Sequence, residues 1–83
     1  MKNFDKISFE HKKILEDVGI ELKRLRTKKT KSYTQLAEEI GISRNTYNSM
    51  ELGKINFQLS TLLQVLDYHG VSIHKFFEDL SKK

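Results

Sequence analysis

The sequence contains no cysteine, no proline and no tryptophan, and only four of its 83 residues are glycine. The absence of cysteine excludes disulfide bonds and thiolate metal sites, which is typical of proteins from a reducing compartment. The absence of proline leaves the helix ends to glycine and serine signals, because no ring interrupts the backbone hydrogen bonds. We therefore expect a cytoplasmic protein built from uninterrupted helices.

Long apolar runs are also missing from the sequence. No stretch approaches the roughly 20 apolar residues that a membrane-spanning helix needs. Residues 1–13, MKNFDKISFEHKK, lack the apolar centre of a signal peptide. We therefore expect no membrane partner. A chain of this length forms one domain with a small core, so association into a dimer would add stability.

Groups that usually carry enzyme chemistry are scarce. The chain has no glycine-rich phosphate loop, and its carboxylates form only neighbouring surface pairs such as Glu38 and Glu39. The three histidines, His11, His69 and His74, do not have the spacing of a metal-ligand set. We therefore expect no enzymatic activity, no metal and no cofactor.

The hydrophobic residues that are present recur with helical spacing along the chain, which predicts an all-α fold. A first helix would run from Asp5 or Ser8 to about Lys28, and two further helices would cover residues 59–69 and 72–80. The expected apolar stripes are Leu15, Val18, Leu22 and Leu25 in the first helix, and Leu59, Leu62, Leu63 and Leu66 in the helix over residues 59–69.

Residues 32–52, SYTQLAEEIGISRNTYNSMEL, form the most informative pattern. Ser32 and Ser43 are N-cap residues, and Gly41 permits the positive φ that a sharp turn between two helices requires. The first of these helices would bury Leu36 and Ile40, four residues apart. The second helix would turn Tyr47 and Met50 inward and would turn Arg44, Asn45, Asn48 and Ser49 outward.

The order and spacing of these residues resemble the helix-turn-helix of phage-repressor and Cro-like proteins, the XRE family. The resemblance rests on Gly19, Arg26, Leu36, Ala37, Gly41, Glu51, Gly53, Lys54, Gly70, Val71 and Ser72. It implies a compact five-helix, lambda-repressor-like DNA-binding domain over residues 15–83, and residues 1–14 would be an extension that lengthens the first helix. In this extension we expect Phe4, Ile7 and Phe9 to pack, on the core or in a dimer contact.

The resemblance implies a sequence-specific regulator of transcription that binds double-stranded DNA. It would bind a pseudo-palindromic operator as a homodimer, with residues 43–52 in the major groove. The predicted base-reading residues are Arg44, Asn45, Thr46, Asn48 and Ser49, since arginine forks onto guanine and asparagine pairs with adenine. A phosphate contact or a free surface charge is the alternative for Arg44. The predicted phosphate-binding residues are Ser32, Tyr33, Ser43, Lys54 and Asn56.

A basic run precedes the motif, in a chain whose net charge is only +4. Its members are Lys23, Arg24, Arg26, Lys28, Lys29 and Lys31, with no acid among them. Cations also stabilise helix C-termini, but the neighbouring motif favours phosphate contact.

Two structural roles follow from the resemblance. Arg26 and Glu51 match an ion pair that ties the first helix to the end of the recognition helix, and a partly buried pair of this kind stabilises the fold strongly. The terminal region of the family often mediates self-association. The predicted dimer interface is Val65, Tyr68, Phe77 and Leu80, with core packing as the alternative for each residue.

Two variants of this function remain open. The same fold serves as an antitoxin that neutralises a partner toxin and represses its own promoter. In size and in the ending over residues 72–80, SIHKFFEDL, the chain also resembles small controller proteins of restriction-modification systems. RNA polymerase or a toxin would then be a partner besides DNA.

Overall fold

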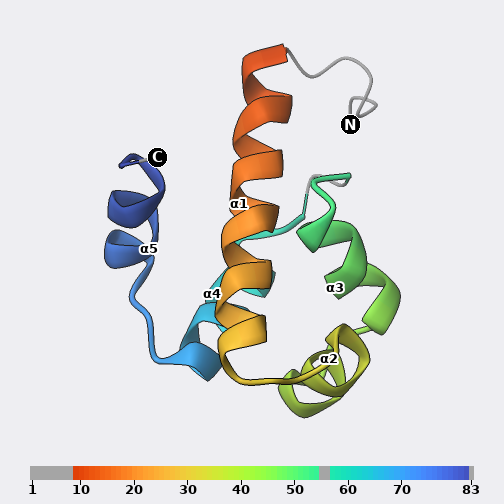
Figure 1. The fold of residues 1–83 in the computed structure, drawn as a ribbon. Coiled ribbons are helices and arrows are strands. Elements are labelled where there is room, and N and C mark those ends of the chain that lie inside the picture. The colour runs from red at the N-terminus through yellow and green to blue at the C-terminus, as the bar shows by residue number, and fades with distance from the viewer. Residues whose placement is uncertain (1–8, 55–56, 83) are drawn as a thin grey trace.

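A computed structural model describes residues 9–54 and 57–82 of the chain. These residues form five helices, shown in Figure 1, which confirms the all-α fold class. The helices are α1 (Phe9–Lys28), α2 (Tyr33–Ile40), α3 (Arg44–Glu51), α4 (Leu59–His69) and α5 (Ile73–Leu80). The predictions for Phe4, Ile7 and Asn56 fall outside the described residues.

The long helix α1 stands at the centre of the fold, with α2 and α3 on one side of it and α5 on the other (Figure 1). Val18 and Leu22 are buried, and Leu15 and Leu25 are partly buried, so the predicted stripe of this helix is confirmed. Packing of Phe9 on the core, one of the two expected alternatives, is wrong, because 82% of this residue is exposed on the first turn of α1. A dimer contact of Phe9 stays a prediction. α1 extends beyond the helices that could cover this turn.

The turn between α2 and α3 has the predicted geometry. The hydroxyl of Ser32 accepts from the Gln35 amide at 3.1 Å, and the Gln35 side chain accepts from the Ser32 amide at 3.0 Å, which completes a capping box. Gly41 ends α2 with φ of 93°. The amides of Gly41 and Ile42 both donate to the Ala37 carbonyl, so the chain turns without losing backbone hydrogen bonds.

The core lies where α1, α2, α3 and α4 meet, and α5 adds one aromatic ring to it. The fully buried apolar residues are Val18, Leu22, Leu36, Ala37, Tyr47, Met50, Leu62, Val65, Leu66 and Phe76. Tyr47 and Met50 therefore face inward as predicted. Ile40 and Ile42 pack against the edge of this cluster and are partly buried.

The stripe predicted for α4 requires correction. Leu62 and Leu66 are buried, but 60% of Leu59 and 38% of Leu63 are exposed, and Val65 takes the inner position instead. The segment LSTLLQVL offers apolar side chains around most of the helix, so its periodicity does not define a single inner face. The contact with α2 determines which side of α4 faces the core.

Candidate nucleic-acid interface

The side chains of α3 divide between the core and the surface. Tyr47 and Met50 anchor the inner side and are fully buried. The five predicted base-reading residues lie outside the core: Arg44 and Asn45 are exposed, and Thr46, Asn48 and Ser49 are partly buried. The beginning of α3 therefore offers its side chains to a ligand most freely.

The N-terminal ends of α2 and α3 are both capped by serine. The Ser43 hydroxyl accepts from the Thr46 amide at 3.3 Å, as Ser32 does from Gln35. The first amides of each helix have no partner within the helix, so a phosphate oxygen can accept from them. Tyr33 occupies the first position of α2 and is exposed. Lys54 is exposed on the turn that follows α3.

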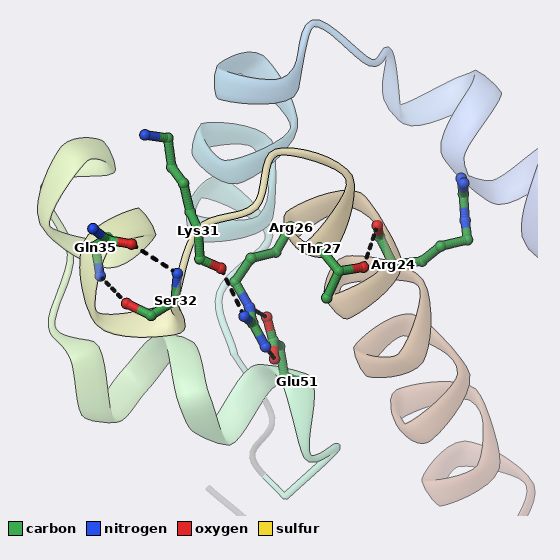
Figure 2. A network of polar contacts seen from close by, with 7 residues as sticks. All are labelled: Arg24, Arg26, Thr27, Lys31, Ser32, Gln35 and Glu51. Atoms are coloured by element: carbon green, nitrogen blue, oxygen red, sulfur yellow. Dashed lines mark hydrogen bonds and ion pairs between the residues drawn. The ribbon is translucent and has the colours of Figure 1, made fainter.

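The predicted ion pair between Arg26 and Glu51 is confirmed (Figure 2). The Nε and Nη2 atoms of Arg26 donate to the two carboxylate oxygens of Glu51 at 2.7 and 2.9 Å. The side chains are 13% and 5% exposed, respectively, so water screens the pair only weakly. Hydrogen bonding to Glu51 raises the pKa of Arg26 above its usual value.

Arg26 also contacts the residue that precedes the N-cap of α2. Its Nη1 atom donates to the Lys31 carbonyl at 2.8 Å, next to the capping box of Ser32 and Gln35 (Figure 2). One guanidinium group thus connects the end of α1, the start of α2 and the end of α3. These contacts fix α2 and α3 relative to each other.

The hydroxyl of Tyr47 is buried beside this ion pair. Among the described residues, this hydroxyl has no hydrogen-bond partner. Burial raises the pKa of Tyr47 far above its usual value, and the neighbouring Glu51 carboxylate raises it further. The hydroxyl therefore stays protonated under all physiological conditions.

Two glycines bring the backbone of α1 against the end of α3. A Cβ atom at Gly19 would lie 2.6 Å from the Met50 carbonyl oxygen and closer still to that of Glu51. Gly53 has φ of 69°, and a Cβ atom there would lie 2.7 Å from the Cα atom of Glu16. From the sequence alone, Gly19 is expected only to weaken the helix slightly. The signal for the close contact is the glycine itself, because a glycine inside a helical pattern can mark a position where another backbone packs closely.

Most cations of the basic run have partners from elsewhere in the chain. Arg24 binds the buried carboxylate of Glu21 at 2.6 Å, and Lys31 binds Glu39 at 2.9 Å. Lys29 lies 5.2 Å from the ring centre of Tyr68, within cation–π range. The hydroxyl of Tyr68 donates to Glu39, and this bond and the one from Lys31 lower the pKa of Glu39. The run contains no acidic residue in the sequence, but in the folded chain acidic side chains from outside the run lie next to several of its cations.

The four residues of the predicted dimer interface do not form one surface. For Val65 the interface role is wrong and the alternative, core packing, is confirmed, because this side chain is fully buried in the core and is inaccessible to a second subunit. Tyr68 lies beside Lys29, beyond the C-terminal end of α1. Phe77 and Leu80 lie instead with Ile14, near the other end of α1. Together with Asp17 and Ser81 these three residues line a hollow of about 260 Å³.

Neither a metal site nor a membrane span is found in the described part of the chain. No three His, Asp or Glu side chains gather there as a possible metal site. None of the described helices combines the length and the apolar character needed to cross a membrane.

Two capped helices joined at Gly41, with the second anchored by its apolar side and polar on its outer side, define a helix-turn-helix protein. The family model described as helix-turn-helix, HTH_3, matches residues 22–76, and the chain belongs to this family. It is a DNA-binding transcriptional regulator.

The chain is also similar to control protein C.MunI from Mycoplasma sp. The two sequences are 35% identical over 66 residues, which cover 78% of this chain and 89% of that protein. The similarity therefore spans nearly the whole of the relative.

Proposed function

We propose that the protein binds a pseudo-palindromic operator as a homodimer and places residues 43–52 of each subunit in the major groove. The observation that carries this proposal is the division of α3. Its inner side is anchored by Tyr47, Met50 and the Arg26–Glu51 pair, while Arg44 and Asn45 are exposed at its beginning. A rigid helix with free polar side chains in its first turn is suited to base recognition.

Base reading would depend on five side chains of α3. Arg44 can donate two hydrogen bonds to guanine, and Asn45 or Asn48 can form a bidentate pair with adenine. Each good bidentate contact discriminates against a wrong base by about 1–3 kcal/mol. Thr46 and Ser49 are shorter and would contribute single hydrogen bonds or methyl contacts. Because Asn48 and Ser49 are partly buried, they would contact DNA only where the bases of the major groove come close to α3.

Phosphate contacts would fix the position of the domain on the duplex. The start of α2 would supply the hydroxyl groups of Ser32 and Tyr33 beside the first amides of the helix, and Ser43 would start α3 in the same way. Lys54 and Asn56 would hold the backbone at the other end of α3. A binding role of this kind requires no catalytic group, and we propose that the protein is not an enzyme.

The second subunit would cover the hollow beside α5. Phe77 is 39% exposed and Ile14 is 52% exposed, and Leu80 completes the apolar lining that they share. A small domain gains stability when a partner buries such a surface. About 21 Å of α1 separate Ile14 from Lys28, so this interface would leave Tyr68 outside.

The similarity to a control protein supports a role in controlling the expression of genes close to the operator. The protein would either block RNA polymerase or contact it. Protein concentration and dimerisation would set the response.

Selection of duplex DNA from a random pool by the purified protein tests this proposal. Two half-sites in inverted order, with centres about 34 Å or one helical turn apart, are the expected result. A variant in which Arg44, Asn45 and Asn48 are all replaced by alanine is the matched control, because it keeps the core and the ion pair. The proposal fails if the wild-type protein enriches no sequence, or if this variant enriches the same one.

A further inference from the structure

One face of α1 lies against the end of α3 and the turn that follows it. Gly19 meets the carbonyl groups of Met50 and Glu51, and Arg26 binds the side chain of Glu51. Glu16 meets Gly53 in the same turn. Positions 16, 19 and 26 thus mark the stripe of α1 that faces the C-terminal end of α3.

Lys23 belongs to this stripe. It follows Gly19 by four residues and precedes Arg26 by three, the spacing at which helical side chains are neighbours. A helical side chain leans toward the N-terminal end of its own helix, so that of Lys23 leans toward the level of Gly19 and the end of α3. Unlike its two neighbours on the stripe, Lys23 is exposed.

Three other cations of the basic run are held by ion pairs within the chain. Arg24 is bound to Glu21, Arg26 to Glu51, and Lys31 to Glu39. Across residues 9–54 and 57–82, Lys23 has no carboxylate within ion-pair distance. Its charge is therefore available to a ligand that approaches the end of α3.

We propose that Lys23 is a further phosphate-binding residue, which acts with Lys54 to hold the DNA backbone at the C-terminal end of α3. The inference rests on the proposed function, because it requires α3 to lie in the major groove. Lys23 reaches the backbone from α1, and Lys54 reaches it from the turn after α3. Two cations from separate elements would clamp one stretch of phosphates, and the Arg26–Glu51 pair would fix the distance between them.

Salt dependence of DNA binding tests this inference. The probe is the duplex recovered by the selection described above, and binding of wild type, Lys23→Gln and Lys28→Gln is measured over a series of KCl concentrations. Lys28→Gln is the matched control, because it removes the same charge from the same helix. Lys28 lies five residues from Lys23, which is about 140° around the helix. On that side of α1 it lines a hollow together with His69 and Val71.

Loss of Lys23 should reduce the slope of log K against log salt by about 0.9 for each bound subunit, since one phosphate per subunit is no longer neutralised. Lys28 belongs to the basic run, but its position on another side of α1 from Lys23 turns it away from the end of α3, so Lys28→Gln should keep the wild-type slope. Equal slopes for Lys23→Gln and wild type would overturn the inference, as would equal reductions in both variants. A failure of the wild-type protein to bind any duplex would instead overturn the proposed function.

Thermal denaturation of the same variants separates this role from a structural one. Lys23 follows by one helical turn Gly19, which meets the C-terminal carbonyl groups of α3, and a nearby cation stabilises such groups. We expect Lys23→Gln to melt within about 4 °C of wild type, because substitutions at exposed positions of this kind alter stability little. A lowered melting temperature with an unchanged salt slope would show that Lys23 serves the fold and not the DNA.

Discussion

Arg26 and Glu51 are 25 residues apart in sequence, yet the guanidinium group of one meets the carboxylate group of the other through two hydrogen bonds of 2.7 and 2.9 Å. The pair lies between the end of α1 and the end of α3, where little water reaches it. The position of α3, the proposed recognition helix, therefore depends on a contact between residues outside the proposed base-reading set.

Replacement of Arg26 by alanine should destabilise the fold by about 3–5 kcal/mol, because it leaves the Glu51 carboxylate buried without its partner. Chemical denaturation measures this loss. Asp17→Asn, which breaks the exposed pair between Lys13 and Asp17, is the control and should cost less than about 1 kcal/mol. Equal stabilities of Arg26→Ala and wild type would refute the structural role of the pair.

Gly19→Ala tests the contact between the backbones of α1 and α3. Alanine favours an isolated helix over glycine by about 1 kcal/mol, but its methyl group would collide here with the carbonyl groups of Met50 and Glu51. We expect a net loss of about 1–3 kcal/mol, as for other overpacked sites. Ile20→Ala, at the exposed neighbouring position, should change stability little. A stabilised Gly19→Ala variant would contradict the close approach.

Asn48→Ala and Lys54→Ala should affect DNA binding in different ways. Loss of Asn48 should relax preference at one base pair by about 1–3 kcal/mol and leave non-specific affinity unchanged. Loss of Lys54 should weaken binding to all sequences and reduce the salt slope by about 1 per subunit. Binding assays on the selected duplex and on single-base variants of it distinguish the two. Identical behaviour of both variants would contradict the assignment of roles.

His69 should make stability fall in acid. Burial lowers the pKa of His69 below its ordinary value of 6.5, and the nearby charge of Lys29 lowers it further. Below pH 6.5 the unfolded chain therefore binds the proton more readily than the folded chain, so stability decreases as pH falls through this region. Tyr68 stacks edge-on against His69, and because its hydrogen bond to Glu39 raises its pKa, it stays protonated over this range.

Melting temperatures at a series of pH values check this dependence. His69→Gln should flatten the decrease, whereas His74→Gln, at an exposed position, should retain it. An unchanged pH profile in His69→Gln would assign the decrease to other groups.

Phe77→Ser should shift a homodimer toward monomers, because it removes the largest apolar side chain from the hollow that Ile14 and Leu80 share. Sedimentation over a range of protein concentrations measures the shift. Ile20→Ser removes an apolar side chain of 57% exposure from another face of α1 and should leave the association unchanged. A monomeric wild-type protein, or a fully dimeric Phe77→Ser variant, would exclude this interface.

Local signals explain the features that could be predicted from the sequence. Ser32, Gly41 and Ser43 act through their own backbone neighbours, so the caps and the turn follow from residue type and spacing. The Arg26–Glu51 pair spans 25 residues and came from resemblance to a known family. Direct base and phosphate contacts stay predictions.

The errors concern residues whose surroundings depend on tertiary packing. Val65 and Leu63 are both apolar and two residues apart, and only the docking of α4 places one inside and the other outside. Phe9 is exposed because the first turn of α1 extends beyond the neighbouring helices. Composition does not reveal how far one helix extends beyond another. The acidic partners of the basic run likewise come from other turns and other helices, as Glu39 does for Lys31.

The unbroken length of α1 has a last consequence. This helix carries Ile14 at the proposed subunit contact and Arg26 at the contact with α3, the proposed recognition helix. Its length therefore sets the distance and the rotation between these two contacts. Insertion of a single residue between these positions would rotate one end against the other by about 100°. A change in the residue count of α1 would therefore misalign the two recognition helices of the proposed dimer with the two half-sites of its operator.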